Sequence, residues 1–371
     1  MQDGANIKPL TSLRFFAAIW VVLFHYWHNL AGVSGTPSVV EKGYLGVELF
    51  FTLSGFILCH VYLTGLGEGR FKYGSFLWAR LARVYPLHIA TLLGVGVMAL
   101  VATAAGMSVD GNILSWSSLP ANLLMIHAWG FAPQAGWNHP SWSISAEWFA
   151  YLMFPAFGAI AWRLRDRPYM AMAGSVAFLA LLYVVFERVA GFPLTRATIA
   201  WGALRIVPCF TLGCATYLVW RRSGATGAAE RRDQAAIGAV FFGAGILLAA
   251  QFGAPDALIV PGFAGLILSL AKLARAGSKF GSNPAFVYLG EISYSVYMIC
   301  IPWQLVFVNV ATKVMHLSDK KLPLYAWLVF IVAVVPLAAA SYHLIEKPAR
   351  ERMKLIAQRR VTHAIATAPV R

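Results

Sequence analysis

Long apolar stretches alternate with short polar connections along this chain, and this alternation constrains the fold more than any other feature. A helix needs about 20 mainly apolar residues to cross the hydrocarbon core of a membrane. Ten stretches meet this requirement, over residues 13–32, 43–64, 84–106, 143–162, 169–187, 199–220, 235–251, 256–275, 287–312 and 323–345. We therefore predict an all-α integral membrane protein with about ten transmembrane helices.

The low charge content supports a membrane protein. Only 12% of the 371 residues are charged, about half the share of roughly 25% in soluble domains, so a soluble globular protein is excluded. The apolar stretch over residues 118–131 is short and contains Pro120, which predicts an interfacial or re-entrant segment. The four cysteines lie in apolar stretches without zinc or disulfide spacing, so we expect buried thiols and no metal site.

The first apolar stretch could also be a secretory signal peptide, because Lys8 and Arg14 precede it. No cleavage site of small residues follows promptly after Phe24, and Tyr26 and Trp27 would be unusual at a cleavage junction. The pattern therefore favours a first membrane span.

Basic residues are distributed unevenly between alternate connections. The chain has 30 Lys and Arg against 15 Asp and Glu, an excess that would suggest nucleic acid binding in a soluble protein. Of the basic residues, 23 fall in the N-terminus, in every second connection and in the tail, and six fall in the other connections. Such asymmetry marks the cytoplasmic side. We therefore predict both termini in the cytoplasm, a multi-pass protein of the cytoplasmic (inner) membrane, a transmembrane domain over 1–346, a basic tail over 347–371 on the membrane lipids, and no nucleic acid partner.

Ionisable residues inside spans are candidates for function, because they are costly there unless they are paired or hydrated. Arg14 and His25 are 11 residues apart, which places them on one helical face about 16 Å apart along the axis. If Trp142 marks the interface, Glu147 lies about 7 Å below it, at a depth similar to that of His25. A histidine beside a carboxylate is typical of a general base, so Glu147 is a candidate partner of His25.

Two further features leave alternatives open. Glu48 enters the second span at a comparable depth, and it either orients His25 or is a neutral or paired residue at a small-residue packing site. Arg80 and Arg83 lie one turn apart at the cytoplasmic start of the third span. They could bind a phosphate group or simply anchor the helix at the positive side.

These residues fall within a set of motifs that resembles the acyltransferase-3 family of integral membrane acyltransferases. The motifs are Leu13-Arg14 with ten residues before His25, the block from Gly43 to Phe56, Arg80-x-x-Arg83-x-Tyr85-Pro86-Leu87, Pro140 to Glu147 followed by Tyr151 and Pro155, Leu289 to Ser295 with Tyr297, and Ser341-Tyr342 before Glu346-Lys347-Pro348. Two positions depart from the family pattern. Glu48 stands where Asp is usual, and Cys300 stands near a position where histidine is common, so no proton chemistry is assigned there.

The resemblance implies transfer of an acyl group from cytoplasmic acyl-CoA, with acetyl-CoA the expected donor, to a hydroxyl of a carbohydrate or lipid-linked glycan at the outer face. It implies His25 as the catalytic histidine, Arg14 as its partner, Glu147 as an essential acid and Arg80 and Arg83 as contacts of the CoA phosphates. Further residues occupy motif positions and are candidates for binding substrate: Trp142, Ser143, Ser145, Tyr151 and Tyr294.

Two other functions remain as alternatives. The acceptor could be a small hydrophobic metabolite such as a macrolide, which would use the same core. A transporter or flippase would also place ionisable groups in the membrane, but it predicts broken helices in matching halves of the chain, and the sequence has no such pairing. The sequence leaves open whether His25 deprotonates the acceptor hydroxyl or carries the acyl group itself.

Overall fold

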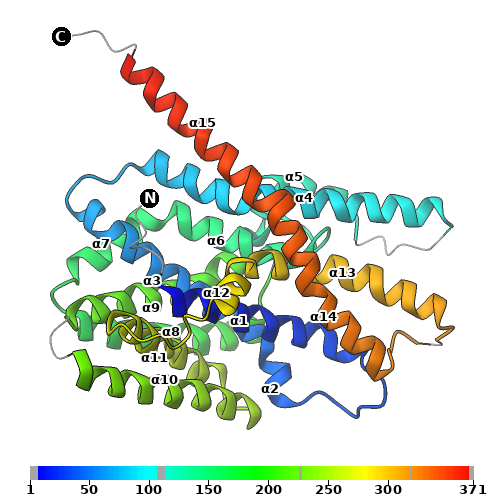
Figure 1. The fold of residues 1–371 in the computed structure, drawn as a ribbon, viewed down its shortest axis with the longest axis horizontal. Coiled ribbons are helices and arrows are strands. Elements are labelled where there is room, and N and C mark those ends of the chain that lie inside the picture. The colour runs from blue at the N-terminus through cyan, green and yellow to red at the C-terminus, as the bar shows by residue number, and fades with distance from the viewer. Residues whose placement is uncertain (1–6, 107–112, 225–227, 318, 367–371) are drawn as a thin grey trace.

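The computed structural model describes residues 7–106, 113–224, 228–317 and 319–366, and no β-strand occurs in these ranges. A single bridge joins Leu30 and Leu322. The helices, shown in Figure 1, are α1 (Lys8–Tyr26), α2 (Ser38–Glu41), α3 (Gly46–Gly67), α4 (Tyr73–Ala104), α5 (Leu119–Leu123), α6 (Trp142–Leu152), α7 (Phe154–Arg163), α8 (Pro168–Ala190), α9 (Gly202–Arg222), α10 (Ala228–Gln251), α11 (Asp256–Arg275), α12 (Pro284–Glu291), α13 (Ser293–Val314), α14 (Leu324–Ser341) and α15 (Lys347–Ala366). Short helical turns are η2 (Trp27–Asn29), η3 (Lys42–Leu45), η4 (Trp116–Ser118), η5 (His127–Phe131), η6 (His139–Ser141), η7 (Leu194–Arg196) and η8 (Tyr342–Glu346).

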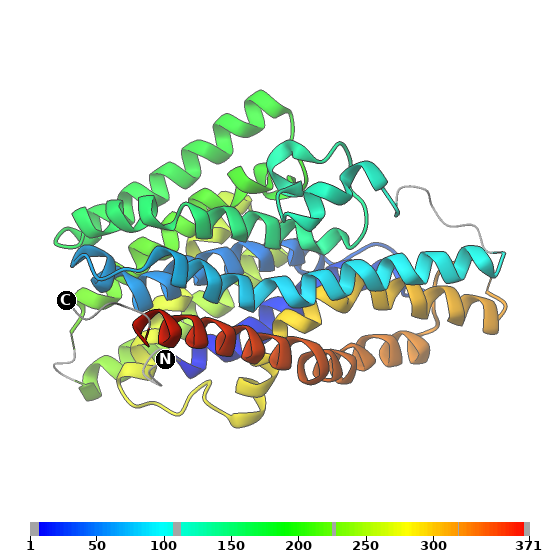
Figure 2. The same ribbon diagram turned by 90° about the horizontal axis from the view of Figure 1, so that it is seen from above.

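The prediction of a multi-pass membrane protein is confirmed. Within the described ranges, 9 helices are long and apolar enough to cross a membrane, and a bent pair brings the number to 10. The start of α1 and the end of α15 lie toward the same end of the bundle (Figures 1 and 2). Which side of the membrane that end faces stays a prediction from the basic residues.

The fourth predicted span, residues 143–162, is not one straight helix. The segments His139–Leu152 and Phe154–Arg163 meet at an angle of 56°. Pro155 follows the break and occupies the first turn of α7, where the missing N–H of proline costs no helical hydrogen bond. The direction of helix α6 therefore differs from that of α7, which the length of the apolar stretch did not predict.

Two other boundaries differ from those predicted. Helix α4 begins at Tyr73 rather than at residue 84, so Arg80 and Arg83 lie inside the helix and not at its start. Helices α14 and α15 are joined without a gap by the π-helical turn η8, so the predicted division at residue 346 falls within one helical run.

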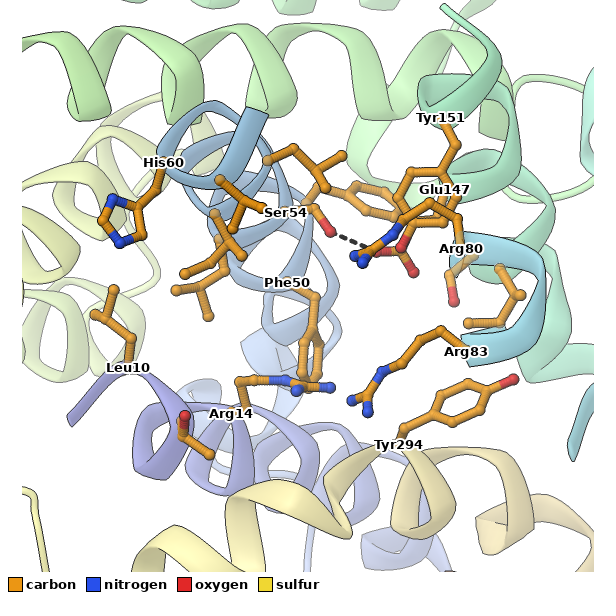
Figure 3. Close-up of a pocket in the computed structure, with 18 of the residues that line it drawn as sticks. Leu10, Arg14, Phe50, Ser54, His60, Arg80, Arg83, Glu147, Tyr151 and Tyr294 are labelled. Atoms are coloured by element: carbon orange, nitrogen blue, oxygen red, sulfur yellow. Dashed lines mark hydrogen bonds between the residues drawn. The ribbon is translucent and has the colours of Figure 1, made fainter. Parts of the chain in front are cut away.

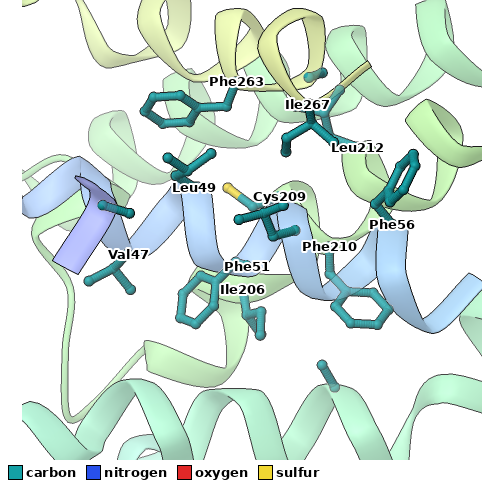
Figure 4. Packing of buried hydrophobic residues seen from close by; sticks show 14 of the residues in the cluster. Val47, Leu49, Phe51, Phe56, Ile206, Cys209, Phe210, Leu212, Phe263 and Ile267 are labelled. Carbon is teal, nitrogen blue, oxygen red and sulfur yellow. The ribbon is translucent and has the colours of Figure 1, made fainter. Parts of the chain in front are cut away.

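The centre of the bundle is the contact of α3 with α9, onto which α11 packs. Phe51 and Phe56 of α3 lie against Cys209 and Phe210 of α9 (Figure 4). The two backbones can approach closely because Gly213 has no side chain. A Cβ atom at this position would clash with the carbonyl oxygen of Thr52. All four cysteines are free and buried, as the sequence predicted.

The C-terminal helix lies on one side of this centre. Helix α15 packs along α4, and Figure 2 shows the two running side by side. The indole N–H of Trp78 on α4 donates a hydrogen bond of 2.8 Å to the carbonyl oxygen of Met353 on α15.

Candidate functional site

A cavity of about 700 Å³ lies between α1, α3, α4, α6 and α13. Its volume falls within the range of about 300–1,000 Å³ that is usual for sites of small molecules and cofactors. Figure 3 shows Arg80, Arg83, Glu147, Tyr151 and Tyr294 gathered at one side of the cavity, with Leu10 and His60 at the other. The lining residues that the sequence had singled out are Arg14, Arg80, Arg83, Ser143, Glu147, Tyr151 and Tyr294.

Three arginines reach the cavity from two helices. Arg14 extends from α1, and Arg80 and Arg83 extend from α4, where a separation of three residues keeps them on one face. The Arg80 guanidinium lies 5.7 Å from the centre of the Tyr62 ring and 6.0 Å from that of Tyr151. These aromatic faces hold a cation without neutralising it, so its positive charge remains available to a ligand.

Glu147 stands among these arginines. The Ser54 hydroxyl donates a short hydrogen bond to its carboxylate (Figure 3), and Arg14 and Arg83 lie within electrostatic range of it. Tyr151 follows one helical turn later on α6 and lines the same cavity. The cavity thus presents a carboxylate and several cations to one ligand.

The predicted pairing of Glu147 with His25 is wrong. Glu147 shares the cavity with Arg14, whereas His25 lies three turns further along α1, about 16 Å away along the axis. The predicted depth depended on Trp142 as an interfacial marker. Trp142 is instead only 5% exposed, and its ring lies beneath the guanidinium of Arg205 at 4.5 Å. A buried tryptophan marks no interface, so Glu147 lies deeper than expected.

Glu48 does not orient His25 either. Its carboxylate accepts two hydrogen bonds from Arg205 on α9, at 2.5 Å from Nε and 3.0 Å from Nη2. Arg205 donates a third, of 2.8 Å, to the carbonyl oxygen of Ala197. Glu48 and Arg205 are 0% and 2% exposed. The alternative of a paired residue at a packing site is therefore the one that the structure supports for Glu48.

His25 lies outside the cavity. Val47, a lining residue, follows Gly46, which packs against Ala17 on α1. His25 is eight residues beyond Ala17, about 12 Å further along the helix. Its ring contacts the Phe24 ring and lies within electrostatic range of His28 and His139. It forms no side-chain hydrogen bond to any part of the chain that the structure describes, so both ring nitrogens can meet a substrate.

The remaining candidates divide into lining and supporting residues. Ser143 lines the cavity and donates a 2.9 Å hydrogen bond to the Tyr297 hydroxyl, and the Tyr294 hydroxyl donates one of 2.7 Å to the Val84 carbonyl. Ser145 faces away from it, and its hydroxyl accepts a hydrogen bond from the Ala128 amide. Ser145 thus holds the connection near η5, and together with Trp142 it supports the site from outside.

Sequence reasoning assigned no site role to three residues in or beside the cavity. Ser54 and His60 line the cavity, and the carboxylate of Glu346 lies 3.5 Å from Arg83. The helical period offered a signal for Ser54, because positions 47, 50, 54, 57 and 61 form one face of α3. No local pattern links Glu346 to Arg83, since 263 positions separate them in the sequence.

No group of three His, Cys, Asp or Glu side chains among the described residues could hold a metal ion. The site has cations, a carboxylate and hydroxyl groups. These suit an anionic organic ligand and proton transfer.

Comparisons with known proteins agree with this arrangement. A family model described as an acyltransferase domain matches residues 8–343. Acyltransferase MdmB of Streptomyces mycarofaciens is 29% identical over 320 residues, which cover 79% of this chain and 78% of that protein. A protein of Staphylococcus aureus strain COL, provisionally named an O-acetyltransferase, is 23% identical over 369 residues, 93% of this chain but 57% of its own length.

A third relative, protein 2 in the picA locus of Rhizobium radiobacter, is 55% identical over 83 residues, 22% of this chain and 40% of that protein. No solved structure is a significant match. The family model spans nearly all of the helical bundle and every residue that lines the cavity except Ile7. The chain therefore belongs to the acyltransferase-3 family and is a multi-pass membrane acyltransferase.

Proposed function

We propose that this protein is an acyl-CoA-dependent O-acyltransferase that moves an acyl group, acetyl by expectation, to a hydroxyl of a carbohydrate acceptor at the extracytoplasmic face. The observation that carries the proposal is the cavity that joins Arg14, Arg80 and Arg83 to Glu147. CoA has phosphate groups at one end and a thioester at the other. Guanidinium groups recognise phosphates through paired hydrogen bonds.

In this proposal the donor enters from the cytoplasmic end, the end at which α1 begins. Arg80 and Arg83 bind its phosphates, and the acyl end extends toward Ser143 and Glu147. Arg14 lines the same cavity and supplies a third cation that holds the donor before its acyl end moves toward His25. Glu147, held by Ser54, keeps Arg14 and Arg83 in place.

His25 acts at the far end of the path. We assign it the removal of the proton from the acceptor hydroxyl, because its ring nitrogens have no competing hydrogen bond among the described residues and a neutral imidazole accepts a proton readily. The gap of about 12 Å between the level of Ala17 and His25 requires the acyl end to move past Val47 before transfer.

The test is release of free CoA by the purified protein in proteoliposomes supplied with acetyl-CoA and acceptors. We expect His25→Asn to reduce acceptor-dependent release to background, because asparagine cannot take up the proton. The matched control is His316→Asn, since His316 is exposed and outside the cavity. Appreciable transfer by His25→Asn would overturn the role of His25.

Two acceptor classes are compared in the same assay, a glycan with free hydroxyl groups and a small hydrophobic alcohol such as a macrolide. Gain of an acetyl-sized mass on the glycan alone supports the carbohydrate acceptor. Gain on the small alcohol alone would replace it. Absence of CoA release with every acceptor would contradict acyl-CoA-dependent transfer.

A further inference from the structure

The arginine wall of the cavity continues beyond the lining residues onto the C-terminal helix. Arg350 and Lys354 on α15 are four residues apart, one helical turn, so they lie on the same face. Lys354 lies within electrostatic range of Arg350, Arg83 and Arg80. Neither α15 residue lines the cavity itself. They therefore extend its cationic wall outward from Arg80 and Arg83.

A carboxylate ties the two helices together at this point. Glu346 is 1% exposed, and it lies 3.5 Å from Arg83 and 3.6 Å from Arg350. Its other oxygen accepts a 2.9 Å hydrogen bond from Ser295 on α13. The bond from Trp78 to Met353 fixes α15 against α4 one turn further on. These contacts hold Arg350 and Lys354 beside the cavity.

The cationic wall has more positive than negative charge. Its five cations are Arg14, Arg80, Arg83, Arg350 and Lys354, and two carboxylates, the partly exposed Glu147 and the buried Glu346, lie among them. The exposed Glu351 also lies near Lys354, which leaves two positive charges unmatched. The Nε groups of Arg80 and Arg350 are buried without a hydrogen-bond partner in the described chain. Unmatched buried charge is costly, so the wall is suited to a ligand with several negative charges.

We propose that α15 completes the donor site, with Arg350 and Lys354 binding the 3′-phosphate on the ribose of CoA while Arg80 and Arg83 bind the diphosphate. This inference depends on the proposed function. CoA has its thioester, diphosphate and 3′-phosphate in that order along the molecule, and the 3′-phosphate is the charged group farthest from the acyl end. With the thioester near Glu147 and the diphosphate at Arg80 and Arg83, the next cations are those of α15, because Lys354 lies within electrostatic range of Arg83 and Arg80.

The test compares acetyl-CoA with acetyl-3′-dephospho-CoA, which lacks only this phosphate. We expect the native protein to favour acetyl-CoA by about tenfold or more in kcat/KM, since one charge-assisted hydrogen bond accounts for about a tenfold change. Lys354→Ala should remove most of this preference by raising KM for acetyl-CoA, with kcat and the kinetics of the dephospho donor unchanged. Arg350→Ala should act in the same direction.

The matched control is Arg352→Ala, which removes one positive charge from the same helix at an exposed position. It should keep the preference for acetyl-CoA. A second readout needs no catalysis: adenosine 3′,5′-bisphosphate should bind the native protein more tightly than ADP, and Lys354→Ala should abolish the difference. Lys354 forms no ion pair with any other residue that the structure describes, so its variant carries the test if Arg350→Ala fails to fold.

Three results would overturn the inference. The native protein could use both donors equally, or Lys354→Ala and Arg352→Ala could behave alike. Either result would leave the proposal of CoA-dependent transfer intact and would contradict only the role of α15. If the protein neither uses nor binds acyl-CoA, the proposed function and this inference fall together.

Discussion

Two groups of charged residues inside the bundle occupy neighbouring regions and differ in how their charges are balanced. In the first, Glu48 and Arg205 form a closed pair with two hydrogen bonds between them. In the second, Arg14, Arg80 and Arg83 surround Glu147 at the wall of a cavity. In the first group the two charges match, and neither Glu48 nor Arg205 lines the cavity. The second has an excess of cations and an adjoining space.

This difference separates a structural role from a functional one. A buried ion pair with good geometry satisfies itself, and removal of either partner leaves an uncompensated charge. An unbalanced cluster next to a cavity is costly until a ligand of opposite charge arrives. Charge balance and access to a cavity thus distinguish the functional group from the structural pair.

The largest expected effect is on the closed pair. Glu48→Ala leaves the buried Arg205 guanidinium without its compensating carboxylate, and we expect a loss of about 3–5 kcal/mol of stability. Thermal unfolding in detergent, followed by the amount of monodisperse protein, measures it. The double variant Glu48→Ala with Arg205→Met should recover part of the loss, because no buried charge remains. A stable Glu48→Ala protein without transferase activity would contradict the structural role of Glu48 and indicate a catalytic one.

Arg83→Ala should reduce activity and leave stability unchanged, in contrast to Glu48→Ala. Folding should be retained, since the substitution reduces the excess of cations, while kcat/KM for acyl-CoA should fall by about 1.5–3 kcal/mol in free energy, the value of a hydrogen bond to a charged group. Steady-state kinetics with varied donor measures the change.

The matched control for Arg83→Ala is Arg221→Ala, because Arg221 is an exposed arginine that does not line the cavity. It should leave donor kinetics unchanged. A large loss of stability in Arg83→Ala would show that the second group is structural as well.

Addition of CoA without an acceptor should stabilise the folded protein, because CoA binds the second group of charges and not the first. At a CoA concentration about 100 times Kd, binding to the folded state adds about 2.7 kcal/mol, which thermal unfolding detects. The same increase in an Arg83→Ala and Arg80→Ala double variant would mean that CoA binds elsewhere.

The smallest effect is expected for Ser54. Ser54→Ala removes the hydroxyl that donates to Glu147, and we expect a loss of about 1 kcal/mol in kcat/KM. Ser54→Thr keeps the hydroxyl and should retain most of the activity. If Ser54→Ala and Ser54→Thr were equally impaired, the volume at position 54 would matter rather than the hydrogen bond.

Several parts of the site could be predicted from the sequence because they depend on one helix at a time. Arg80 and Arg83 share a face since they are three residues apart, and Arg14 precedes His25 by three turns. Such relations are independent of the rest of the fold. The predicted pairing of Glu147 with His25 was wrong because it compared depths on two helices, and that comparison assumed a straight fourth span with Trp142 at its outer end.

The sequence by itself determined that the chain crosses a membrane many times, that its ionisable residues in the spans are few, and which of them belong to family motifs. These properties follow from hydropathy and helical period, which are local. Only the tertiary structure decided which carboxylate meets which arginine. Glu48 pairs with Arg205, Ser54 with Glu147 and Glu346 with Arg83. Such pairs depend on helix register, on the 56° bend after α6 and on the path of α15, and these are set by packing between distant segments.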